Sequence, residues 1–166
     1  RLAELYAAAD RTRREHVGDA VHLRGLVEIS NCCVRECGYC GLRAPNRSVR
    51  RYRMGADGIL ACARDAAALG YGTVVLQAGE DYGIRAAWMA ALIRRIKEET
   101  GLAVTLSLGE RSEEELALWR AAGADRYLLR FETSDRELYD WIHPPRPGRV
   151  SDRIALIVTG GDFVNR

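Results

Sequence analysis

The chain has 166 residues, a length that suits one domain with a buried core. Hydrophobic residues make up 48% and charged residues 29%, and the net charge is only +2, so the composition indicates a globular protein without a nucleic-acid or membrane partner. Four of the five cysteines crowd together, unlike those of a secreted disulfide framework, and no leader-like segment opens the chain. We expect a cytoplasmic protein and, because the chain opens on Arg1, a segment in front of it.

Strands and helices alternate along the chain, as the periodicity of the apolar residues indicates. The expected elements, in chain order, are helix 2–16, strand 22–30, helix 56–70, strand 72–79, helix 86–100, strand 102–109, helix 111–123, strand 125–133 and helix 134–142.

Several helix ends carry recognisable signals. Asp57 is placed to cap the helix that starts at 56, and Gly70 is placed to stop it. Gly101 follows the next helix in the same way. Ser112 and Glu115 have the spacing of a capping box, which predicts a helix start at that point.

Four repeats of strand and helix predict βα units on a parallel sheet, either doubly wound or in a TIM-type barrel. Each strand ends in polar or glycine-bearing residues, and active sites of (β/α) barrels lie at the carboxyl ends of the strands, so this pattern favours the barrel. Four units are about half of the ~8 in a closed barrel. We divide the chain into a helical lead-in (1–22), βα units (23–157) and a divergent tail (158–166).

A cysteine motif directly follows the first strand. Cys33, Cys37 and Cys40 form C-x3-C-x2-C, with Tyr39 before the last cysteine. Structural zinc and ferredoxin clusters both use about four protein ligands, so three thiolates suit a [4Fe–4S] cluster with one iron left open. A zinc or ferredoxin-type loop is the alternative. Cys32 lies outside this spacing and Cys62 on a helix, and we expect no ligand role for either.

The motif at the end of a first barrel strand resembles the signature of the radical S-adenosylmethionine (SAM) superfamily. In that superfamily the open iron binds SAM, and electron transfer from the cluster yields a 5′-deoxyadenosyl radical that abstracts hydrogen from a substrate. The resemblance implies a [4Fe–4S] cluster and SAM as cofactors. It also implies that the fold is the N-terminal half of a TIM-type radical SAM (β/α) barrel, an α/β fold, and that this chain is an incomplete part of it.

Longer stretches indicate the branch of the superfamily. They are GDAVHLRGLVEISNCC, CGYCGLRAPNRSVRRYRM, TVVLQAGED, VTLSLGERSEEEL and AGADRYLLRFETSDRELY, and together they resemble the [FeFe]-hydrogenase maturases of the HydE type. Methylornithine synthase is the next relative and biotin synthase a more distant one. The resemblance implies a role in assembling the hydrogenase active site. A lysine mutase like methylornithine synthase is the alternative within the superfamily, and a truncated, catalytically inert cluster-binding fragment is the alternative outside it.

The resemblance also assigns site residues. The cluster ligands are Cys33, Cys37 and Cys40, and Tyr39 lies beside the SAM adenine. The SAM contacts expected elsewhere are Gln77, Gly79, Glu80, Glu132 and Arg153, of which Gln77–Glu80 depart from the superfamily's GGE stretch at the first two positions. Thr105 and Arg130 fall in the substrate region.

Partners follow from the same resemblance. They are a small-molecule or iron-complex substrate, an electron donor such as a ferredoxin or flavodoxin, and other hydrogenase maturation proteins. We expect no nucleic-acid partner, because the basic run from Arg47 to Arg53 is short, and we interpret it as a loop beside the cluster. His16, His22 and His143 do not cluster in the sequence, and we expect them to be structural.

Overall fold

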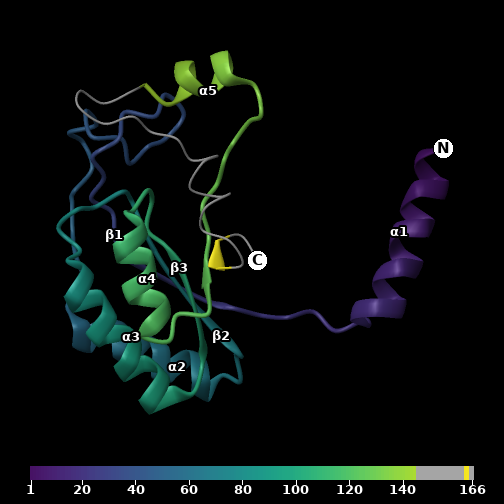
Figure 1. Cartoon of the computed structure of the whole chain (residues 1–166), viewed down its shortest axis with the longest axis horizontal. Helices are drawn as coiled ribbons and strands as arrows, with labels where there is room; N and C mark the ends of the chain where they lie inside the picture. Colours follow the sequence, from purple (N-terminus) through teal and green to yellow (C-terminus); the bar gives the residue numbers. More distant parts are fainter. Residues whose placement is uncertain (145–162, 165–166) are drawn as a thin grey trace.

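Four parallel strands form one sheet in this computed structural model, which describes residues 1–144 and 163–164. The strands are β1 (Gly25–Ser30), β2 (Thr73–Ala78), β3 (Ala103–Ser107) and β4 (Arg126–Tyr127). Their order across the sheet is their order in the chain, so each strand pairs with the next. Figure 1 shows β1, β2 and β3 in a view of the whole chain. Sequential parallel strands with one helix after each strand are the arrangement of a (β/α) barrel wall, as the sequence predicted.

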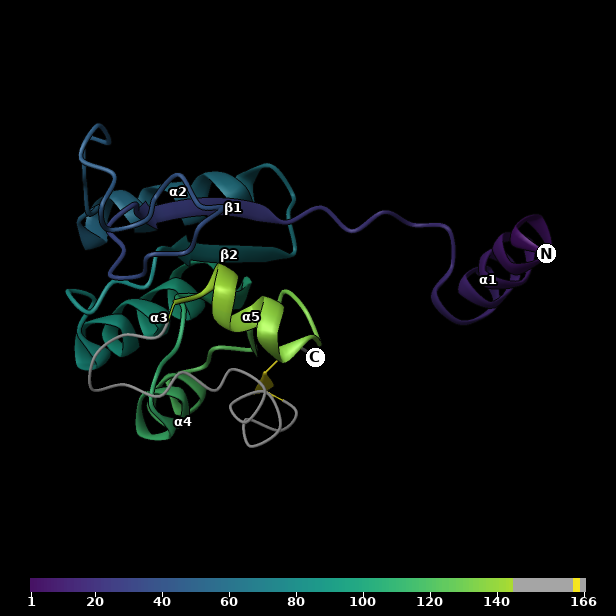
Figure 2. The ribbon, with the colours of Figure 1, turned by 90° about the horizontal axis from the view of Figure 1, so that it is seen from above.

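Three helices cover one face of this sheet. They are α2 (Ala56–Ala68), α3 (Ala86–Thr100) and α4 (Glu113–Ala121), and neighbouring helices in this series contact each other (Figure 2). The strand residues on that face are apolar and buried. One row runs through paired positions across all four strands, from Val27 through Leu76 and Leu106 to Tyr127. The core therefore lies between the sheet and the helices.

Strand side chains alternate between the two faces of a sheet. On the opposite face the side chains are polar toward the carboxyl ends of the strands, whereas the preceding residues on that face include Leu26 and Val75. Glu28, Gln77 and Ser107 stand on it at successive strands, and none of the three is buried. These side chains lie near the carboxyl ends of β1, β2 and β3. The short helix α5 (Arg136–Ile142) lies beyond the same ends, where the backbone N–H of Gly38 donates to the carbonyl of Ile142 at 3.0 Å (Figure 1).

Most predicted elements are present, with differences at their ends. The capping box of Ser112 and Glu115 is confirmed, and Gly101 ends α3 in the left-handed conformation. The predicted Asp57 cap is wrong: Gly55 is the N-cap of α2, and Asp57 sits inside the first turn, where its charge still suits the helix dipole.

The fourth strand is much shorter than the predicted 125–133. Just beyond Tyr127, the N–H of Leu128 donates to the carbonyl of Leu106 in β3. β3 itself ends at Ser107, one residue beyond the partner of Tyr127, and Gly109 follows with φ 78°, so the pairing of the two strands ends at this point. The first strand likewise begins at Gly25 rather than at 22.

Helix α1 (Leu2–Val17) stands apart from the sheet, at the end of an extended segment (Figure 1). None of its residues is buried, and Leu2, Leu5 and Tyr6 are exposed. Among the described residues, no helix combines the length and the apolar character that crossing a membrane requires.

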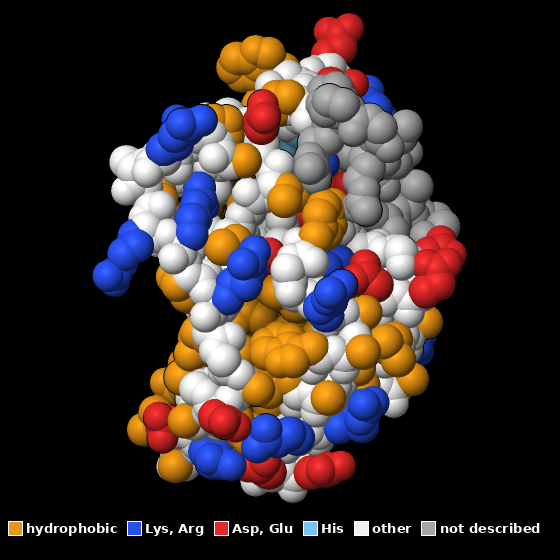
Figure 3. Space-filling view, turned by 90° about the vertical axis from the view of Figure 1, so that its left-hand side faces the viewer, with side chains coloured by type: hydrophobic (Ala, Val, Ile, Leu, Met, Phe, Trp, Pro, Cys, Tyr) orange, Lys and Arg blue, Asp and Glu red, His pale blue; other side chains and the backbone are white. Residues whose placement is uncertain are grey.

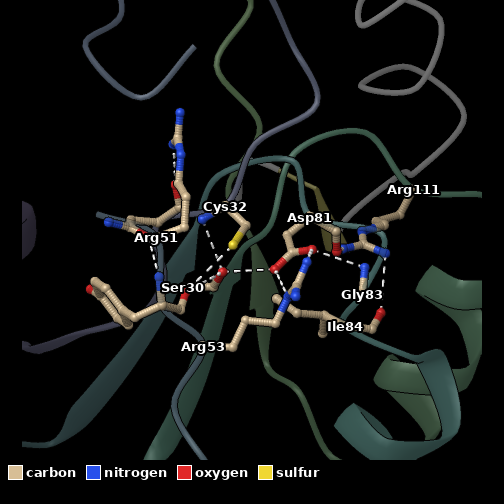
Figure 4. A network of polar contacts seen from close by, with 10 residues as sticks. Ser30, Cys32, Arg51, Arg53, Asp81, Gly83, Ile84 and Arg111 are labelled. Carbon is tan, nitrogen blue, oxygen red and sulfur yellow. Dashed lines mark hydrogen bonds and ion pairs between the residues drawn. The ribbon is translucent and has the colours of Figure 1, made fainter. Parts of the chain in front are cut away.

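A buried carboxylate joins three segments at the carboxyl ends of β1 and β2 (Figure 4). Asp81 Oδ2 accepts hydrogen bonds from Ser30 Oγ and Arg53 Nε, both at 2.7 Å. Its Oδ1 accepts from Arg53 Nη2 at 2.8 Å and from the N–H of Gly83 at 2.9 Å. Burial raises the pKa of the Asp81 carboxyl, but the hydrogen bonds from Arg53, Ser30 and Gly83 outweigh burial and bring the pKa below its ordinary value of 3.8.

We predict that Asp81→Asn lowers the free energy of unfolding at pH 7 by about 1–3 kcal/mol, because it removes charge-assisted hydrogen bonds. The pKa of Asp81 is lower in the folded chain than in the unfolded one, so its contribution is present above pH 3.8 and is lost as the pH falls through the folded pKa. Urea unfolding at a series of pH values should show a weaker acid dependence in the variant. The exposed Asp65→Asn is the control, and an unchanged acid dependence in Asp81→Asn would contradict the assignment.

Candidate functional site

The cysteine loop (residues 31–46) leaves β1 and folds against the end of β2. The N–H of Gly79 donates to the carbonyl of Ser30 at 3.3 Å, and the N–H of Val34 donates to the carbonyl of Glu80 at 3.0 Å. A Cβ atom at Gly79 would lie 2.3 Å from the carbonyl oxygen of Cys32 and 2.7 Å from Cβ of Cys33. Only glycine permits this approach, so position 79 sets how closely the loop lies to the sheet.

A pocket of about 220 Å³ opens where the cysteine loop meets the strand ends. Cys33, Cys37 and Cys40 all line it, although they come from an irregular loop. The other predicted site residues that line it are Tyr39, Gln77, Gly79, Glu80, Arg130 and Glu132. The structure therefore gathers residues from the loop, from β2 and from the segment after β4 around one space.

Two predicted residues are not among the pocket's lining residues. Thr105 is buried on the polar face of β3, and its hydroxyl has no hydrogen-bond partner among the described residues. Ser107, two residues further along the same face, does line the pocket. Arg153 lies outside the described residues.

Glu80 points into a buried charged cluster. Its Oε2 lies 3.9 Å from Nε of Arg35 and accepts from the N–H of Glu110 at 3.1 Å, and its Oε1 accepts from the Tyr82 hydroxyl at 2.7 Å. Arg35 also pairs with Glu110 at 3.2 Å, and only 3% of Arg35 is exposed. Because Arg35 lies between Cys33 and Cys37, the Glu80 carboxylate contacts the cysteine loop from the sheet side.

The aromatic ring of Tyr39 is held by α5 and the residue after it. The Tyr39 hydroxyl lies 2.8 Å from Nε2 of His143, a hydrogen bond, and the ring of His143 stacks on Tyr139 with centroids 4.7 Å apart. His143 is buried, with 2% of its surface exposed. The expectation that His143 is structural therefore omits its contact with the site.

Glu132 adopts a backbone conformation that is uncommon outside glycine. Its φ is 64°, the one positive value among the described non-glycine residues. Such a conformation costs about 1–3 kcal/mol and is retained chiefly where the surroundings or the function demand it. It therefore adds an independent physical reason to place Glu132 in the site.

The sequence interpretation missed three residues that organise the site: Arg35, Arg51 and Asp81. Arg35 and Asp81 are charged residues beside predicted site positions, a weak signal, and their burial becomes evident only in three dimensions. Arg51 donates to carbonyls of the cysteine loop, including that of Leu42 at 2.9 Å. The basic run thus lies beside the cysteines, as predicted.

Figure 3 shows the Lys and Arg side chains of one face spread out and separated by other side chains, beside a hollow lined by hydrophobic ones. On the part of this face that the structure describes, the Lys and Arg side chains form no continuous basic surface of the kind that a nucleic-acid backbone would need.

The chemistry of the donor set fits an iron–sulfur cluster. None of the five cysteines forms a disulfide. In the described part of the chain no three His, Cys, Asp or Glu side chains are grouped to hold one metal ion, as a structural zinc site requires. Thiolates of a [4Fe–4S] cluster each bind a different iron and need no such convergence, and cysteine is the usual ligand of these clusters.

Comparisons with known proteins agree with this geometry. Residues 27–158 match the family model of the radical SAM superfamily. The chain is 46% identical over 140 residues to the [FeFe] hydrogenase maturase subunit HydE of Thermotoga maritima, covering 84% of this chain and 40% of that protein. It is 29% identical over 141 residues to 3-methylornithine synthase of Methanosarcina acetivorans, with the same two coverages.

A solved structure shares the fold. The crystal structure of methylornithine synthase (PylB) superimposes with a TM-score of 0.83 and 29% identity, covering 97% of this chain and 48% of that one. This chain spans about 40% of the length of the curated relatives named above. Because the family model covers most of the chain, this protein belongs to the radical SAM superfamily.

Proposed function

We propose that this chain binds a [4Fe–4S] cluster through Cys33, Cys37 and Cys40, binds SAM beside it, and serves in the assembly of the [FeFe]-hydrogenase active site. The observation that carries the proposal is that the three thiols of a C-x3-C-x2-C motif line one pocket at the carboxyl ends of β1 to β3. When bound, the cluster would supply the electron that cleaves SAM to a 5′-deoxyadenosyl radical.

The side chains around the pocket support a SAM site. Tyr39 presents an aromatic ring that is anchored at its hydroxyl by His143, which suits contact with an adenine. Gln77 and Glu132 offer polar groups for the ribose hydroxyls and the ammonium of SAM. Arg130 carries a guanidinium suited to an anionic group, and we assign it with Thr105 to the substrate side.

The Glu80 side chain makes contacts that bear on the SAM contact expected at this position. Its carboxylate already contacts Arg35, Tyr82 and the backbone of Glu110. We therefore assign the SAM contact at this position to the backbone of residues 77–80, while the carboxylate holds the cysteine loop.

The maturase role is the proposal because the 46% identity to HydE is much higher than the 29% identity to methylornithine synthase. A lysine mutase is the second candidate, supported by the TM-score of 0.83 to methylornithine synthase. Under either one, the reductant is an electron donor such as a ferredoxin or flavodoxin. For the maturase, the substrate is a small molecule or an iron complex, and other hydrogenase maturation proteins are partners.

We predict that anaerobic reconstitution loads about four irons per wild-type chain and that Cys37→Ala retains roughly one or fewer, because an iron without its thiolate leaves the cluster open to loss. Iron and sulfide analysis and the electron paramagnetic resonance (EPR) spectrum of the reduced protein are the measurements.

Two cysteines serve as matched controls for this substitution. Cys62→Ala removes a thiol from α2, and Cys32→Ala removes one from the cysteine loop itself; both should load iron as the wild type does. A full cluster in Cys37→Ala, or its loss in Cys32→Ala alone, would show that the ligand set is assigned wrongly.

We also predict that the reconstituted wild-type chain, given dithionite and SAM, releases 5′-deoxyadenosine, and that Cys37→Ala releases none. Liquid chromatography with mass detection measures the product. Methylornithine formed from added lysine would favour the mutase over the maturase. A full cluster without any 5′-deoxyadenosine would favour the inert fragment.

A further inference from the structure

Arg51 contacts both ends of the cysteine-bearing part of the loop. Its Nη1 donates to the carbonyls of Asn31 at 2.6 Å and Leu42 at 2.9 Å. Its Nη2 donates to the carbonyls of Arg43 at 2.9 Å and Asn46 at 3.2 Å. Asn31 precedes Cys33 by two residues and Leu42 follows Cys40 by two. One guanidinium therefore joins the two sides of the stretch that carries all three predicted ligands.

The segment that carries Arg51 is itself fixed to Asn31. The N–H of Tyr52 donates to Oδ1 of Asn31 at 2.7 Å, and Nδ2 of Asn31 donates to the carbonyl of Arg50 at 2.9 Å. Arg53, two residues further, pairs with the buried Asp81, so Arg51 and Arg53 leave the same short segment toward different partners (Figure 4). The backbone of Arg51 is thus held on both sides.

The cysteine loop has little regular structure to hold it otherwise. Residues 31–46 contain turns but no helix or strand. Ordering such a loop costs conformational entropy at every residue. A contact that is present before the cluster arrives lowers the cost of bringing three thiolates into place, because the loop is already ordered.

Arginine is the residue that this geometry requires. The four carbonyls are reached by two nitrogens of one planar group, which points its N–H bonds in fixed directions. The ammonium of a lysine is a single point with three donors and cannot span four carbonyls in this way.

We propose that Arg51 is a positioning residue that closes the cysteine loop at its neck, defined by Asn31 and Leu42, and so holds Cys33, Cys37 and Cys40 ready for the cluster. The proposal has two parts. The first part, that Arg51 orders the loop, does not depend on the proposed function. The second part, that this order favours binding of the cluster, rests on the proposed function.

The first part is tested without iron. Hydrogen–deuterium exchange of the apo protein should be about ten-fold faster over residues 31–46 in Arg51→Gln than in wild type, while β1 to β3 keep their protection. The matched control is Arg50→Gln, which removes the same charge from an exposed neighbour whose side chain makes no hydrogen bond or ion pair in the described structure. Equal exchange in the two variants would overturn the proposal.

The second part is tested on reconstituted protein. Arg51→Gln should lose iron to a chelator about ten-fold faster than Arg50→Gln and give a broadened EPR signal of the reduced cluster, and Arg51→Lys should restore neither fully. Iron retention and a spectrum equal to wild type would refute the positioning role even if the loop exchanges faster. If the wild-type chain takes up no iron, the proposed function is wrong. The exchange data still show, in that case, whether Arg51 orders the cysteine loop.

Discussion

The arrangement of the site depends on the hydrogen bonds that the buried carboxylate of Asp81 accepts. A charge with 2% exposure is stable only when it is paired, and the donors that pair it come from Ser30, Arg53 and the backbone of Gly83. These residues lie at the end of β1, in the segment returning from the cysteine loop, and after β2. Satisfying one carboxylate therefore forces three separate segments to meet, and the cysteine loop is bounded by two of them.

Three consecutive residues after β2 set three different constraints on that loop. Gly79 lacks a side chain and lets the backbone of Cys32 approach. Glu80 reaches Arg35 inside the loop, and Asp81 reaches Arg53 beyond it. Arg111 lies under this turn and donates to the carbonyl of Asp81 at 2.6 Å, so the turn is also fixed from the side of α4. The position of the predicted ligands is thereby tied to the helix-covered core.

The sequence predicted what depends on local pattern and missed what depends on distant contacts. The strands and helices were recognisable because apolar residues repeat with the periods of the sheet and of the helices, and the capping box because Ser112 and Glu115 are close in sequence. The location of the site could be predicted from the expected sheet, since the carboxyl ends of parallel strands lie at one edge. The length of β4 was not predictable, because it depends on where β3 ends and Gly109 turns. The pairing of Asp81 with Arg53, 28 residues away, leaves no local signal.

Side chains alternate between the two faces of each strand, and this alternation separates the residues of the core from the residues of the pocket. In β2, Leu76 faces the helices and is fully buried, while the next residue, Gln77, faces the pocket. In β3, Leu106 and Ser107 repeat the arrangement. Because neighbouring positions point to opposite faces, pocket residues can change without altering the packing of the core. The residues around the pocket are therefore set by the carboxyl ends of the strands and by the cysteine loop, and not by the side chains that pack the core.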